Sequence, residues 1–349
     1  MQSNEIIGWF ADIGLADRPT VGGKGGSLGE LTRAGIAPPP GFVVRTGAFE
    51  RFIEALEREA PLRAVVEALD ADDLQAVTAC AKALRARVEG APLPEALQAE
   101  ILTAYTDLFA GGAPAPVAIR SSATTEDAED ASFAGLQDTY LWVIGPDEAL
   151  RMVRSCWASL YSVESMTYRL KRGIPESGVA MAVVVQQMVD ARTAGVMFTR
   201  SPTTGDRSVI TIEGAWGLGS AVVSGEVTPD RWVVGKITGD ITVRDISDKH
   251  IQQLPAAGGG ISDVEVEPDR RRAPCLSDPE LLALREIGRR VERHYGRPQD
   301  IEWAVDRSGQ ILLLQSRPET VWSAREAAPV AKPADNPLAH VMTIFGGRR

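Results

Sequence analysis

The strongest constraint on the fold is a change of hydrophobic period along the chain. In the stretches 49–56, 74–88 and 97–108, apolar residues recur at helical spacing. From Val179 onward, β-branched runs lie between Gly, Pro or Asp residues, a pattern that is typical of strands. The sequence therefore predicts a mainly helical first hundred residues and a sheet-rich second half.

Individual elements follow from the same patterns. The run at 117–119 predicts a strand that ends at Arg120, and 147–170 predicts one long helix. In the second half we expect strands at 179–185, 208–212, 231–234, 237–243, 301–305 and 310–314, a helix at 278–294 and a hairpin turn at 306–309. The segment 324–336 is rich in Ala and Pro and has no period, so it predicts a tail or linker.

Length, charge and cysteine content narrow the class of protein. A chain of 349 residues allows two compact units or one large bilobed unit. The net charge of -10 argues against broad nucleic-acid binding, so a polyanionic ligand must meet local positive charge. Three separated cysteines without CxxC spacing argue against a disulfide framework. With no signal-like start and no apolar run long enough to span a bilayer, we expect a cytoplasmic protein with no membrane contact.

A glycine-rich segment at 22–29 is the first candidate for binding. Four glycines surround Lys24, which lets the backbone approach an anion closely, and Ser27 with Glu30 forms a capping-box pattern that predicts a helix start. The N–H groups of that helix would face a phosphate. The segment lacks the order of a Walker motif, so an exposed turn before a helix is the alternative.

A hydroxyl-rich stretch after the predicted strand is the second candidate. Arg120 at the strand end can hold a phosphate with two hydrogen bonds, and the segment from Gly135 to Thr139 could close over it as a lid. A polar surface loop is the alternative.

The predicted C-terminal hairpin is the third candidate. Alternation along a strand places Asp300 and Glu302 on one face, and the turn brings Gln315 to about the same level on the next strand. Two carboxylates and an amide oxygen suit Mg²⁺. A solvated charged face is the alternative. The three histidines, His250, His294 and His340, have no neighbouring ligand or nucleophile, and His294 is predicted to be structural.

Together and in this order, these motifs resemble the nucleotide-binding domain of the dikinase family, which includes phosphoenolpyruvate synthase, pyruvate phosphate dikinase and rifampin phosphotransferase. The resemblance covers about residues 8 to 320. It rests on the segments 22–31, 39–42, 120–139, 195–199, 216–219, 300–303 and 315–318. The family implies an α+β, ATP-grasp-like fold, with two lobes that hold ATP between them. We accordingly expect lobes at 1–185 and 186–322, followed by a tail or linker at 323–349.

The resemblance also implies roles for individual residues, with ATP and Mg²⁺ as cofactors. Lys24, Arg120 and Arg317 would bind the phosphates and neutralise charge on the transferred group. The other implied ATP contacts are Gly135, Thr139, Gln186, Glu302 and Gln315. Of these, Glu302 and Gln315, together with Asp300, would ligate Mg²⁺.

Full-length relatives continue into a phosphohistidine domain and an acceptor domain, which this sequence does not contain. We therefore expect a phosphotransferase that delivers a phosphoryl or pyrophosphoryl group to a histidine on a separate protein, with AMP and Pi as products. Phenylphosphate synthase, which has a separate ATP-binding subunit, is similar in this respect. A nucleotide-sensing module without catalysis and an excised domain of a longer dikinase are the alternatives.

Overall fold

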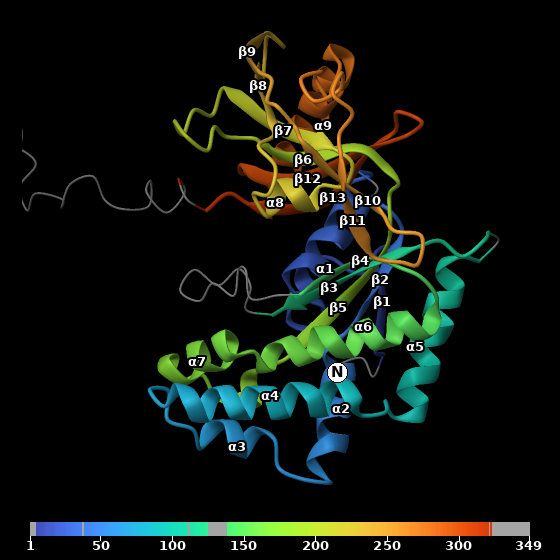
Figure 1. Cartoon of the computed structure of the whole chain (residues 1–349), viewed down its shortest axis with the longest axis vertical. Helices are drawn as coiled ribbons and strands as arrows, with labels where there is room; N and C mark the ends of the chain where they lie inside the picture. The colour runs from blue at the N-terminus through green and yellow to red at the C-terminus, as the bar shows by residue number, and fades with distance from the viewer. Residues whose placement is uncertain (1–4, 37, 111, 125–137, 321, 323–349) are drawn as a thin grey trace, which may run out of the picture.

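The chain forms two α+β lobes, one above the other in Figure 1. The computed structural model describes residues 5–322 apart from 37, 111, 125–137 and 321. One lobe contains a five-stranded sheet in the order β1-β2-β5-β3-β4, and the other a six-stranded sheet in the order β13-β12-β6-β7-β8-β9. All neighbouring strands in both sheets are antiparallel. The two-lobed α+β architecture expected of an ATP-grasp-like fold is confirmed.

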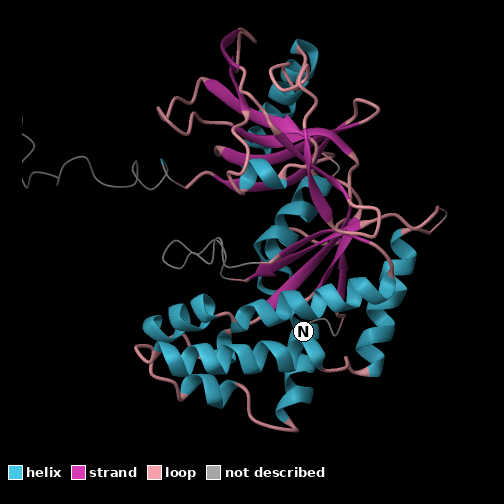
Figure 2. Cartoon of the chain, in the orientation of Figure 1, coloured by secondary structure: helices cyan, strands magenta, loops and turns pink. Residues whose placement is uncertain are grey.

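The first lobe combines its sheet with a thick helical layer (Figure 2). Its strands are β1 (Ile7–Trp9), β2 (Gly41–Val44), β3 (Val117–Ala123), β4 (Thr139–Val143) and β5 (Met181–Gln187). Its helices are α1 (Arg18–Arg33), α2 (Thr46–Glu57), α3 (Arg63–Glu67), α4 (Leu74–Gly90), α5 (Glu95–Leu108), α6 (Pro146–Ala158) and α7 (Val163–Arg172), with 3-10 turns η1 (Leu15–Asp17), η2 (Ser159–Tyr161) and η3 (Glu176–Gly178). The helical character predicted for the first hundred residues is confirmed.

Strand β5 lies at the centre of the first sheet and is buried on both faces. Val183 and Val185 pack into the core formed with the helical layer, whereas Ala182 and Val184 pack with Val21 and Leu28 of α1 on the opposite face. This double burial explains why the sequence there is an unbroken apolar run without polar alternation.

The second lobe is sheet-rich, as predicted. It contains β6 (Ala191–Phe198), β7 (Val209–Trp216), α8 (Ser220–Val223), β8 (Asp230–Gly235), β9 (Ile241–Asp245), β10 (Ile251–Pro255), β11 (Ile261–Glu265), α9 (Asp278–Tyr295), β12 (Gln299–Asp306) and β13 (Ile311–Pro318). Leu281, Leu284 and Val291 of α9 pack with Trp232 and Trp303 of the sheet. The passage between the two sheets is 188–190, just after the division predicted at residue 185.

Three predicted elements differ from the observed ones. The helix predicted at 147–170 breaks at η2 and restarts as α7, because the Ser162 side chain caps a new helix by accepting a hydrogen bond from the Ser165 N–H. The strand predicted to end at Arg120 continues to Ala123, since β3 pairs with β5 over its whole length. The strand predicted at 237–243 begins only at Ile241, because the chain turns at Gly239 with φ +80°.

The helix start predicted at Ser27 is wrong. Helix α1 already begins at Arg18 and is interrupted at Gly22, whose φ of 70° and ψ of 179° are not helical. Only glycine adopts this backbone region readily. A Cβ atom at Gly22 would lie 2.2 Å from the backbone oxygen of Ser122. The break therefore lets the glycine-rich segment lie directly against β3, and Ser27 sits within the helix that follows.

We expect Gly22→Ala to lower the free energy of unfolding by at least about 3 kcal/mol, since it combines backbone strain with a clash against β3. Gly35→Ala is the matched control, because Gly35 also has a positive φ, of +67°, but a Cβ atom there would meet no atom within 4 Å. Strain alone should cost the control about 1 kcal/mol. Urea unfolding of both variants measures the difference, and equal losses would contradict the close packing of Gly22.

Candidate active site

The glycine-rich segment and β3 meet through the side chain of Ser122. This buried hydroxyl donates to the Val21 carbonyl at 2.9 Å and accepts a hydrogen bond from the Gly25 N–H at 3.3 Å. Lys24 lies between these two contacts and is half-buried. Arg120 precedes Ser122 by two residues on β3, so the two side chains point to the same side of the strand. The structure therefore brings the segments that carry Lys24 and Arg120 together.

Arg120 reaches from the first lobe to the second. Its Nη2 donates to Glu302 Oε2 of β12 at 2.8 Å, and its Nη1 donates to the Leu314 carbonyl of β13 at 3.3 Å. The Arg120 side chain is only 11% exposed, whereas the Glu302 side chain is 32% exposed. The guanidinium therefore lies in front of the hairpin that carries the predicted metal ligands.

The register of the β12–β13 hairpin agrees with the sequence prediction. Glu302 is paired directly with Gln315, and Asp300 with Arg317. The Arg317 Nε lies 3.4 Å from Asp300 Oδ2. Burial raises the pKa of Asp300 to about 6, with the Arg317 charge acting in the opposite direction. Asp300 is thus a carboxylate whose negative charge is only partly compensated by its surroundings.

Whether the predicted residues fit a divalent cation can be judged from the hydrogen bonding of two oxygen atoms of the hairpin. Asp300 Oδ1 and Gln315 Oε1 are both buried, and neither finds a hydrogen-bond partner within the described part of the chain. Buried oxygens normally have a partner, so these two are available to a ligand. Although no three His, Cys, Asp or Glu side chains cluster among the described residues, Glu302 and the Gln315 amide complete a hard-oxygen set. The residues fit Mg²⁺.

A cavity of about 260 Å³ lies between the lobes beside Arg120 and Glu302. One wall is apolar and belongs to the second sheet, with Ala194, Leu218, Ala304 and Leu314. Gln186 of β5 also lines the cavity and is 3% exposed. Its Nε2 donates to the Pro39 carbonyl at 3.4 Å, which leaves its Oε1 as an acceptor. An apolar slot with a few oriented polar groups is a typical small-ligand site.

The structure unites some predicted site residues and separates others. Arg120, Thr139, Gln186 and Glu302 line the cavity, whereas Lys24, Asp300, Gln315 and Arg317 do not. The last three lie on the adjoining hairpin, and Lys24 lies on the glycine-rich segment. Gly135 falls outside the described residues.

Sequence reasoning missed several cavity residues. The segment 216–219 contributed to the family resemblance without a binding role for any of its residues, yet Leu218, Gly219 and Ser220 line the cavity, as do Met188 and Val189 between the two sheets. The glycines after a strand were the available signal, but their spacing matched no binding motif.

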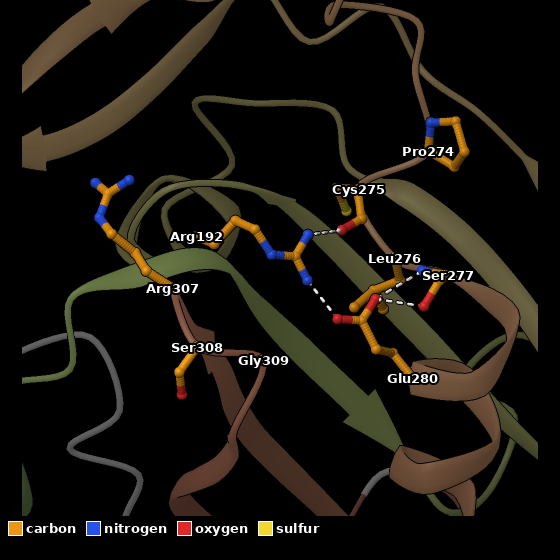
Figure 3. Close-up of a pocket in the computed structure, with 9 residues that line it drawn as sticks. All are labelled: Arg192, Pro274, Cys275, Leu276, Ser277, Glu280, Arg307, Ser308 and Gly309. Carbon is orange, nitrogen blue, oxygen red and sulfur yellow. Dashed lines mark hydrogen bonds and ion pairs between the residues drawn. The ribbon is translucent and has the colours of Figure 1, made fainter.

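A larger hollow on the second lobe is not the candidate site. Figure 3 shows it between the start of α9 and the β12–β13 turn, with a volume of about 470 Å³. Arg192 there donates to the Cys275 carbonyl at 3.1 Å and pairs with Glu280, and Arg307 points away from them. Arg307 instead pairs with Asp190 at 2.7 Å. Each arginine of the hollow is therefore already paired with a carboxylate, Arg192 with Glu280 inside the hollow and Arg307 with Asp190 outside it.

The chain matches a known protein family over most of its length. Residues 18–337 match the family model described as pyruvate phosphate dikinase, AMP/ATP-binding domain. Because the match covers most of the chain, this protein belongs to that family. Among the helices that the structure describes, none has the length and apolar content needed to cross a membrane.

Two curated relatives are similar over nearly the whole chain. A probable phosphoenolpyruvate synthase of Methanothermobacter thermautotrophicus is 43% identical over 90% of this chain and 46% of its own length. The rifampicin phosphotransferase of a Streptomyces species is 42% identical over 91% of this chain and 36% of its own. The chain thus spans less than half the length of each.

The comparison with solved structures is weaker. An L-amino acid ligase from Bacillus licheniformis matches 71% of this chain and 44% of its own, with 11% identity and a TM-score of 0.27. A similarity this low carries no argument about function or mechanism.

The raised pKa of Asp300 predicts a pH dependence of stability in metal-free protein. The folded state keeps this proton up to about pH 6, whereas the unfolded chain releases it near the ordinary pKa of an aspartate side chain, 3.8. Stability contributed by the bound proton is therefore lost as the pH rises from about 4 to 6. Relative to Asp300→Asn, the wild type should lose on the order of 2 kcal/mol across that window. Urea unfolding of both proteins in EDTA, between pH 4 and 6, measures this loss. If the free energies of unfolding of the wild type and Asp300→Asn change in parallel with pH, the prediction is contradicted.

Proposed function

We propose that this chain binds Mg-ATP between its lobes and starts a dikinase-type transfer. The main observation behind this proposal is the Arg120 side chain, which extends from the first lobe to the second and donates a hydrogen bond to Glu302 beside an apolar cavity. The base would occupy the apolar end of the cavity, where Gln186 Oε1 can accept a hydrogen bond from an amino group. The triphosphate would extend toward Lys24, Arg120 and Arg317.

The residues of this site would act by charge and position. Lys24, Arg120 and Arg317 would neutralise negative charge on the phosphates and hold the chain of phosphates in line. Asp300, Glu302 and Gln315 would hold Mg²⁺, which supplies further neutralisation when it is bound. Thr139, at the start of β4, would contact the phosphates from the side of the first lobe.

The acceptor in this proposal is a histidine. Its ring nitrogen would attack the β-phosphorus, the bond to the α-phosphate oxygen would break, and AMP would leave. The pyrophosphoryl-histidine would then release its γ-phosphate to water as Pi. Neither histidine that the structure describes can serve, since His294 pairs with Glu30 at 2.6 Å and His250 with Asp248 at 3.6 Å, and neither lines the cavity.

We place this histidine on a separate protein that also carries the acceptor-binding domain, as in a phenylphosphate synthase-like enzyme. In both curated relatives, more than half of the length lies outside the region shared with this chain, which leaves room in those proteins for a further domain. Without that domain, the chain would bind ATP but transfer nothing.

Calorimetry tests the binding half of the proposal. Mg-ATP should bind in the micromolar range, and Lys24→Ala, Arg120→Ala and Glu302→Ala should each weaken binding at least about tenfold, since a hydrogen bond to a charged group contributes about 1.5–3 kcal/mol. Arg307→Ala is the control, because it removes an arginine whose partner, Asp190, lies outside the interlobe cavity. The absence of heat in the wild type, or full affinity in any one of the three variants, would count against the assigned site.

Transfer is tested with ATP labelled on the β-phosphate. In a lysate from the source organism, label should appear on a second protein through an acid-labile, base-stable bond, as phosphohistidine requires. Lys24→Ala should abolish that label. Label on this chain itself would contradict the separate acceptor, and ATP binding without any labelled protein would favour a nucleotide-sensing role.

A further inference from the structure

Both carboxylates of the predicted metal set are already paired with arginine. Arg120 Nη2 lies 2.8 Å from Glu302 Oε2, and Arg317 Nε lies 3.4 Å from Asp300 Oδ2. The two arginines come from different places, β3 of the first lobe and β13 of the second. Each arginine therefore pairs with a different one of the two acidic groups.

The amide oxygen of Gln315, the uncharged member of the predicted metal set, is not paired with any arginine that the structure describes. Gln315 is 6% exposed, and its Oε1 has no hydrogen-bond partner among the described residues. Arg120 lies beside it, because its Nη1 donates to the Leu314 carbonyl, one residue before Gln315. The oxygens that could ligate a cation thus lie on one hairpin, but the Arg120 guanidinium already contacts that hairpin at Glu302 and Leu314.

A divalent cation arriving alone would meet an unfavourable site. It would have to displace Arg120 from Glu302, or enter beside two positive charges that remain in place. Like charges near one another repel, and the repulsion is least screened at Arg120, whose side chain is only 11% exposed. A polyphosphate changes this balance, since guanidinium groups bind phosphate oxygens with paired, charge-assisted hydrogen bonds.

We propose that Arg120 and Arg317 make the site selective for a metal–polyphosphate complex over the free metal. The polyphosphate draws the two guanidinium groups away from Glu302 and Asp300, and only then do these carboxylates accept the cation. Metal binding is thereby coupled to the presence of the phosphates that the arginines bind. This inference rests on the proposed function, since it assumes that the cavity receives a nucleotide with several phosphates.

Binding of Mn²⁺ in the absence of nucleotide tests the inference, with free Mn²⁺ measured by electron paramagnetic resonance. The full chain should bind Mn²⁺ weakly, and Arg120→Gln should bind it at least about tenfold more tightly, which corresponds to about 1.4 kcal/mol. The double variant Arg120→Gln/Glu302→Gln should lose that gain. Arg307→Gln, which removes an exposed arginine outside the cavity, should leave Mn²⁺ affinity unchanged.

The outcomes separate this inference from the proposed function. An unchanged or lower Mn²⁺ affinity in Arg120→Gln, in a chain whose wild type binds Mg-ATP, would overturn the inference alone. Failure of the wild type to bind Mg-ATP would overturn the proposed function instead. If circular dichroism shows that Arg120→Gln does not fold, Arg317→Gln provides the same comparison through Asp300, and it too must bind Mn²⁺ more tightly than the wild type.

Discussion

The arrangement of the two lobes depends on helix α1. Its residues Val21 and Leu28 pack against the first sheet, while Leu31, near its end, belongs to the core of the second lobe. Polar contacts follow the same path, because the Ser27 hydroxyl donates to the Ser316 carbonyl and Glu30 pairs with His294. One helix thus fixes the first sheet relative to the hairpin of the predicted metal site. The break at Gly22 is what allows this helix to lie so close to β3.

The position of the candidate site follows from that arrangement. Ser122 ties the glycine-rich segment to β3, and Arg120 on the same strand reaches the hairpin of the other lobe. The cationic groups therefore come from the first lobe and from the end of β13, whereas the carboxylates come from β12. Local positive charge of this kind is what a chain with a net charge of -10 needs in order to bind a polyanion.

Sequence reasoning recovered most elements and the register of the C-terminal hairpin. The hairpin register was predictable, since strand alternation and a short turn leave little freedom, and Glu302 does face Gln315. The helix start predicted at Ser27 was wrong because the capping pattern is local. The real break, at Gly22, depends on close packing against a strand about 100 residues away in the sequence. No binding role was predicted for residues 218–220, because they line the cavity through tertiary contacts that no local pattern encodes.

The central claim is that a nucleotide occupies the space between the lobes with its phosphates toward Arg120. A crystal structure of the full chain with Mg²⁺ and a non-hydrolysable ATP analogue tests this most directly. The account predicts the base against the apolar wall of the cavity, the phosphates on Lys24, Arg120 and Arg317, and the metal on Glu302 and Gln315. A nucleotide bound elsewhere, such as in the hollow beside Arg192, would contradict it.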